Sequence, residues 1–128
     1  MMFDSDVLIW ATRGNLDAAA LIDSIPDRCM SIVSVMEILQ GARSLADMRI
    51  VKQSLKELRL RVLPLSERTG YIASALIEEH AMPHGLRVGD ALIAATAIEA
   101  GEVLTTCNAR HFRPIRRLEV KDFHPQKV

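Results

Sequence analysis

The chain has 128 residues, a length typical of one globular domain, so we expect a single domain over residues 1–128. Hydrophobic residues make up 49% of the chain and charged residues 25%, which excludes a largely disordered protein. The 16 basic and 16 acidic residues cancel, but acids gather in residues 1–27 and bases in residues 110–128. That asymmetry leaves room for a cation site and for an anionic partner.

Short apolar runs alternate with longer amphipathic stretches along the chain, which is typical of strands alternating with helices. In chain order, the pattern predicts a strand at 1–3, helices at 7–11 and 15–24, a strand at 29–33, helices at 34–41 and 44–60, a strand at 62–65, helices at 66–82 and 89–100, a strand at 103–107 and an edge strand at 118–120. The alternation favours a mostly parallel sheet with helices on both of its faces.

Several helix boundaries rest on capping residues. Asp6 can cap the helix at 7–11, and Ser34 with Glu37 forms a capping-box pattern at the start of the helix at 34–41. Gly101 is a typical stop for the helix at 89–100, and Asn108 is expected to begin a polar turn.

Acidic side chains follow the predicted strands at the points where ligands bind in parallel sheets. Asp4 follows the first strand, Glu37 lies in the first helical turn after the second, and Asp90 lies in the first turn of the helix at 89–100. Each has an alternative structural role as a helix cap or as a charge that favours a helix N-terminus. Together, three converging carboxylates would repel one another unless a cation neutralised them. Oxygen ligands of this kind suit Mg²⁺ or Mn²⁺.

Four segments carry these residues in a specific order: FDSDVLI at 3–9, SVMEILQG at 34–41, DALIAATA at 90–97 and LTTCNARHF at 104–112. Together they resemble the PIN-domain ribonucleases, specifically the VapC toxins of prokaryotic toxin–antitoxin pairs. The resemblance covers essentially the whole chain. It implies a three-layer α/β/α fold with about five mostly parallel strands, Mg²⁺- or Mn²⁺-dependent cleavage of RNA, dimerisation, and inhibition by a small antitoxin.

The resemblance also assigns roles to residues. It places Asp4, Glu37 and Asp90 at the acidic metal-binding and catalytic positions, with supporting roles for Asp6, Thr106, Asn108 and His111. His111 departs from the family, which usually has a fourth acid there. Because imidazole tolerates Mn²⁺ better than Mg²⁺, we expect Mn²⁺ to support cleavage better.

The basic residues near the C-terminal end are candidates for phosphate contacts, although a solvated edge is an equally simple interpretation. The candidates for RNA binding are Arg110, Arg113 and Arg116. With only three Phe, one Tyr and one Trp in the chain, recognition should depend on RNA shape and phosphate positions rather than on stacking.

Two other functional classes are compatible with parts of the sequence. The loss of the fourth acid leaves open a module that binds RNA or an antitoxin without cleaving. The Asp4-Ser5-Asp6 segment is similar to the nucleophile motif of haloacid-dehalogenase-like phosphatases. However, Leu8 stands where that family needs a small β-branched residue, and Ala94 stands where it needs a second acid.

No apolar stretch approaches the about 20 residues of a membrane span, and no signal peptide is evident. We therefore expect a cytoplasmic protein.

Overall fold

A computed structural model describes residues 1–125. Its elements in chain order are β1 (Met2–Phe3), α1 (Ser5–Thr12), α2 (Leu16–Asp23), β2 (Cys29–Ser31), α3 (Ile32–Gln40), α4 (Leu45–Glu57), β3 (Arg61–Leu63), α5 (Glu67–His84), α6 (Val88–Ala100), β4 (Leu104–Thr106), α7 (Ala109–Phe112) and β5 (Val120–Asp122). Among the helices of this part of the chain, none is long and apolar enough to cross a membrane.

The five strands form one sheet in the order β3-β2-β1-β4-β5, and every neighbouring pair is parallel. β1 is central although it lies nearest the N-terminus, and it pairs with β4 through Met2–Leu104 and Phe3–Thr105. The mostly parallel sheet of about five strands is therefore confirmed. Since all strands run the same way, their carboxyl ends meet at a single edge.

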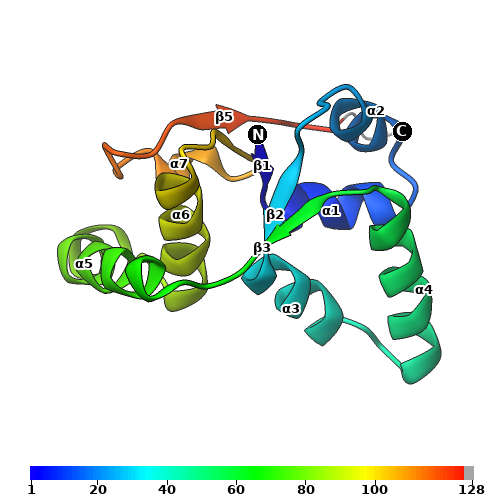
Figure 1. The fold of residues 1–128 in the computed structure, drawn as a ribbon, viewed down its shortest axis with the longest axis horizontal. Coiled ribbons are helices and arrows are strands. Elements are labelled where there is room, and N and C mark those ends of the chain that lie inside the picture. The colour runs from blue at the N-terminus through cyan, green and yellow to red at the C-terminus, as the bar shows by residue number, and fades with distance from the viewer. Residues whose placement is uncertain (126–128) are drawn as a thin grey trace.

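Helices cover both faces of this sheet, as Figure 1 shows, with α5 and α6 to one side and α1, α2 and α4 to the other. Successive strand residues point to opposite faces. Met2 accordingly belongs to the core under α5 and α6, whereas Phe3 belongs to the core under α1 and α2. These two hydrophobic cores fix the sheet between its helical layers, and the three-layer arrangement is confirmed.

Two predicted caps are wrong. Asp4, not Asp6, caps α1, and its carboxylate accepts a hydrogen bond from the Ser5 N–H. Ser31, not Ser34, caps α3, because β2 ends at Ser31 and its hydroxyl accepts from the Val33 N–H. α3 therefore begins earlier than expected, and Glu37 lies in its second turn rather than in a capping box. This shift frees the Glu37 side chain for another contact.

The largest departure lies after β4. The predicted polar turn at Asn108 continues into the short helix α7, which carries Arg110 and His111. Smaller differences are that β5 spans 120–122 rather than 118–120, and that α5 continues past Pro83 to His84. A proline in the last helical turn removes only one backbone donor, so the helix tolerates it there.

Candidate metal centre

The candidate site lies at the carboxyl edge of the sheet, where the sequence predicts it. Asp4 follows β1, Thr106 ends β4, and Glu37 projects from the helix that follows β2. Asp90 lies in the first turn of α6. The topology thus brings site residues that are far apart in the sequence, from Asp4 to His111, to one edge of the sheet. β1 and β4 are direct neighbours beneath them.

Asp4 is the most buried acid of the group, with 6% of its surface exposed. One carboxylate oxygen, Oδ1, accepts from the Ser5 N–H at 2.8 Å and lies 3.3 Å from the Ser5 hydroxyl. The other, Oδ2, accepts from the Thr106 hydroxyl at 2.8 Å. These contacts from two elements fix the carboxylate in one orientation.

Thr106 and Cys107 hold the carboxylate of Asp6, in α1, beside that of Asp4. The Thr106 Oγ1 lies 3.2 Å from Asp6 Oδ2, and the Cys107 N–H donates to the same oxygen at 3.1 Å. The Thr106 hydroxyl carries one proton, so it can donate to only one of the two carboxylates at full strength. It also accepts from the Asn108 N–H at 3.0 Å. Asn108 therefore supports the site through its backbone.

Glu37 reaches the centre through Ser5. The Ser5 hydroxyl donates to Glu37 Oε1 at 2.7 Å, and the same oxygen of Ser5 lies within hydrogen-bond distance of Asp4. On the other side, Glu37 Oε2 lies against Gly89, where a Cβ atom would approach it to 3.1 Å. Sequence reasoning gave neither Ser5 nor Gly89 a role in the site. Their adjacency to Asp4 and Asp90 was the available signal.

Asp90 contacts the residue that departs from the family pattern. Its Oδ2 atom lies 2.8 Å from His111 Nε2, and the two side chains are 28% and 26% exposed. α7, which the sequence did not predict, brings His111 to this position. The imidazole therefore acts here as a hydrogen-bonding partner of a carboxylate.

The negative charges of the site are not neutralised by lysine or arginine side chains of residues 1–125. The pKa of Asp4 rises from 3.8 to about 7, mainly because burial disfavours the carboxylate and further because Asp6 and Asp90 are negatively charged. Burial raises the pKa of Asp6 as well, with Asp90 again contributing. Within residues 1–125, no lysine or arginine forms an ion pair with Asp4, Asp6, Glu37 or Asp90.

The thiol of Cys107, beside the site, is held in its protonated form. Burial raises the pKa of Cys107 to about 12, and the nearby charges of Asp6 and Asp4 act in the same direction. A thiol with so high a pKa stays protonated at neutral pH, and the protonated form is a poor nucleophile. The chemistry of the site therefore rests on its carboxylates.

The side chains at the site carry the type of oxygen atom that binds a divalent cation. Carboxylate oxygens are the ligands that Mg²⁺ and Mn²⁺ prefer. A cation would offset both the burial of the Asp4 carboxylate, which is the main cause of its raised pKa, and the repulsion from Asp6 and Asp90. As they stand, however, no three His, Cys, Asp or Glu side chains in the described part of the chain are grouped closely enough to hold a metal ion. The acids form separate contacts, with Asp4 near Asp6, Glu37 on Ser5, and Asp90 on His111.

The three arginines proposed for RNA binding lie on the surface. Arg110 is in α7, and Arg113 and Arg116 follow it; all three are exposed.

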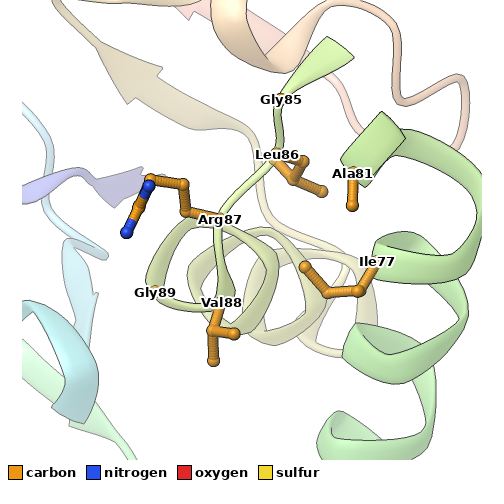
Figure 2. Close-up of a pocket in the computed structure, with 7 residues that line it drawn as sticks. All are labelled: Ile77, Ala81, Gly85, Leu86, Arg87, Val88 and Gly89. Atoms are coloured by element: carbon orange, nitrogen blue, oxygen red, sulfur yellow. The ribbon is translucent and has the colours of Figure 1, made fainter. Parts of the chain in front are cut away.

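A cavity of about 560 Å³ borders the site where α5 passes into α6 (Figure 2). Ile77 and Ala81 form an apolar wall, and Arg87 points away from it. Its described lining contains none of the acids but includes Gly89, which lies against Glu37.

Three comparisons place the chain among known proteins. The model of the PIN domain family matches residues 1–118. Ribonuclease VapC10 of Mycobacterium tuberculosis (strain CDC 1551 / Oshkosh) is 33% identical over 123 residues, which cover 93% of this chain and 90% of that protein.

Solved structures with the same fold include VapBC2 from Rickettsia felis bound to a DNA fragment from its promoter, with a TM-score of 0.79, 21% identity, and 96% and 98% of the two chains covered. DNA-bound VapBC from Salmonella typhimurium has a TM-score of 0.76 and 26% identity, covering 94% and 96%. A toxin–antitoxin complex from Klebsiella pneumoniae has a TM-score of 0.76 and 24% identity, covering 99% and 98%.

Proposed function

The chain belongs to the PIN domain family, and on that premise we propose that it is a metal-dependent endoribonuclease, the toxin of a toxin–antitoxin pair. A relative that is 33% identical is named Ribonuclease VapC10, and the similar structures include VapBC complexes. The observation that carries the proposal is the carboxylate of Asp4. It is buried and held by Ser5 and Thr106, and no lysine or arginine among residues 1–125 forms an ion pair with it.

We assign the cation to Asp4, Asp90 and Glu37, with Mg²⁺ and Mn²⁺ as the candidate ions. When bound, such an ion would stabilise the negative charge that develops on a phosphodiester during hydrolysis. Thr106 and Ser5 hold Asp4 in place, and Ser5 also holds Glu37. Asp6 and Asn108 serve as supports, because each is linked to the Thr106 hydroxyl.

The proposed partners are an RNA substrate, a small antitoxin protein, and a second copy of the chain in a homodimer. The antitoxin proposal is supported by the VapBC complexes among the similar structures. An arginine of an antitoxin could neutralise the same carboxylates, since guanidinium and carboxylate groups form paired hydrogen bonds. Such a contact would compete with the cation and keep the toxin inactive.

The function is tested by incubating the purified protein with bulk RNA in Mn²⁺ and in excess chelator. We expect cleavage in Mn²⁺ and none in chelator. Sequencing of RNA 5′ ends after expression would then identify the substrate and the cut site. Binding of RNA without any cleavage would favour the alternative of a non-catalytic binding module.

Gly89→Ala is expected to reduce cleavage by about three- to tenfold without destabilising the protein. The new Cβ atom would stand 3.1 Å from Glu37 Oε2, so the carboxylate must retreat by a few tenths of an ångström. Small displacements of catalytic groups lower rates strongly. Urea unfolding should show equal or slightly higher stability, because alanine restricts the unfolded chain. Gly70→Ala is the matched control, since a Cβ there meets nothing within 4 Å. Equal loss in both variants would contradict the placement of Glu37.

Mn²⁺ is expected to support cleavage at least about fivefold better than Mg²⁺, because an imidazole stands beside Asp90 and tolerates Mn²⁺ better. His111→Asp should narrow that difference by supplying the acid that the family usually has there. The measurement is the initial cleavage rate across a titration of each ion. Equal rates with both ions in the unmodified protein would remove the explanation.

A further inference from the structure

A small cavity lined by one arginine and two imidazoles lies directly beside the acidic centre. It has a volume of about 260 Å³ and is lined by His84 from the end of α5 and by Asn108, Arg110, His111 and Pro114 around α7. No acidic side chain lines it. Its volume is below the range of pockets that enclose whole drug-sized ligands, so it suits a single group rather than a complete small molecule.

We propose that this cavity, defined by His84, Arg110 and His111, binds a phosphate of the RNA backbone next to the phosphate that is cleaved. The proposal rests on the proposed ribonuclease function and adds to it the position of a second phosphate. RNA, the substrate of the proposed activity, carries phosphates at regular spacing along its chain. A site that holds one of them would set which bond reaches the carboxylates.

The charges of the lining residues favour an anion. Arg110 is exposed, and no acidic side chain in the described residues pairs with its guanidinium. A guanidinium can form two parallel hydrogen bonds with phosphate oxygens. Among residues 1–125, His84 makes a tilted ring contact with His80, at 5.4 Å between centroids, and no hydrogen bond there engages its ring nitrogens. The amide of Asn108 adds a further neutral donor.

His111 connects the cavity to the acidic centre. It lines the cavity and, through Nε2, contacts Asp90 at 2.8 Å. One side chain thus lies between a compartment that contains an arginine and a compartment that contains carboxylates. A phosphate over the carboxylates requires a cation, whereas a neighbouring phosphate in the cavity would meet basic side chains directly. The two compartments therefore suit two successive phosphates of one strand.

The test uses the Asp4→Asn protein, in which cleavage is blocked, and a fluorescent single-stranded RNA 12-mer of mixed sequence, in Mn²⁺. Adding Arg110→Gln should weaken binding about fivefold at low salt and lower the slope of log Kd against log salt by about 0.7, the value for one phosphate contact on a single strand. Arg110→Lys should retain most of the affinity. Arg13→Gln, an exposed arginine on α1's C-terminal end, is the control and should change neither quantity.

A second measurement locates the contact. In histidine ring NMR spectra of the Asp4→Asn protein, the 12-mer should shift the signals of His84 and His111 and leave that of His124, which pairs with Asp122, unchanged. Arg110→Gln should remove the His84 shift at the same RNA concentration. Tight RNA binding that is indifferent to Arg110→Gln, with no His84 shift, would overturn the phosphate site and leave the ribonuclease proposal intact. Failure of the Asp4→Asn protein to bind RNA, together with failure of the unmodified protein to cleave it, would overturn both.

Discussion

Asp4→Asn is expected to lower the rate of RNA cleavage by at least about a thousandfold. The substitution keeps the size of the side chain and one carbonyl oxygen, so the bond from the Ser5 N–H can survive. It removes the negative charge from the most buried acid of the centre. A metal ion contributes several kcal/mol to hydrolysis, and each 1.36 kcal/mol corresponds to about a tenfold change in rate. The measurement is single-turnover cleavage of an identified RNA substrate in saturating Mn²⁺.

Asp23→Asn is a suitable control for this experiment. Asp23 ends α2, is exposed, and lies outside the group of acids at the carboxyl edge of the sheet. Its replacement removes the same net charge without touching the centre, so cleavage should stay within about twofold of the unmodified protein. Near-normal cleavage by Asp4→Asn would show that the cation is held elsewhere.

The metal-free protein is expected to lose stability as the pH rises from 5 to 8. Folding raises the pKa of Asp4 from 3.8 to about 7, so between these values the folded protein holds a proton that the unfolded chain has released. Stability therefore falls with rising pH across this window, and the contribution of Asp4 is lost once the pH exceeds about 7. The difference of about three units sets an upper limit of roughly 4 kcal/mol. Urea unfolding in chelator at pH 5, 6, 7 and 8 measures it.

The Asp4→Asn substitution separates the effect of Asp4 on the pH dependence of stability from the effects of other titrating groups. Asp4→Asn has no carboxylate at this position, so its stability should depend less on pH, and at pH 8 it should exceed that of the unmodified protein by about 1–3 kcal/mol. Added Mn²⁺ should stabilise the unmodified protein most at pH 8 and Asp4→Asn least. An unmodified protein whose stability rises between pH 5 and pH 8, with the same slope in Asp4→Asn, would contradict the assigned burial. Stability and activity are thus expected to change in opposite directions at this residue.

The alternation of apolar runs and amphipathic stretches predicted the parallel sheet, because strands buried on both faces need helices between them. The helix at Ser44 and the stop at Gly101 also follow from local sequence, and both are observed. The start of α3 does not follow, because Ser31 and Ser34 are both good caps and the extent of pairing in the sheet decides between them. α7 was missed since four residues are too few to show a periodicity.

Asp4 and Asp90 were identifiable as candidates because one follows a strand and the other lies in the first turn of a helix, whereas Glu37 was placed by a capping box that α3 does not have. The connections among these acids were not identifiable, since they depend on hydroxyl groups that local sequence treats as ordinary polar residues. Ser5 links Asp4 with Glu37 only because α3 begins at Ile32, which places Glu37 in its second turn. The role of Gly89 likewise depends on the approach of another helix.

The central position of β1 has a consequence for the protein while it is being made. Asp4 is fixed by Thr106, a residue 102 positions later, and its backbone N–H donates to Thr105. A ribosome must therefore release residues 4–106 before Asp4 acquires these two long-range partners. Long-range pairing of this kind forms late, since it requires closure of a large loop. A nascent toxin would accordingly remain harmless until Thr106 has left the ribosome and paired with Asp4, which gives an inhibitor the opportunity to meet the protein at the moment it becomes active.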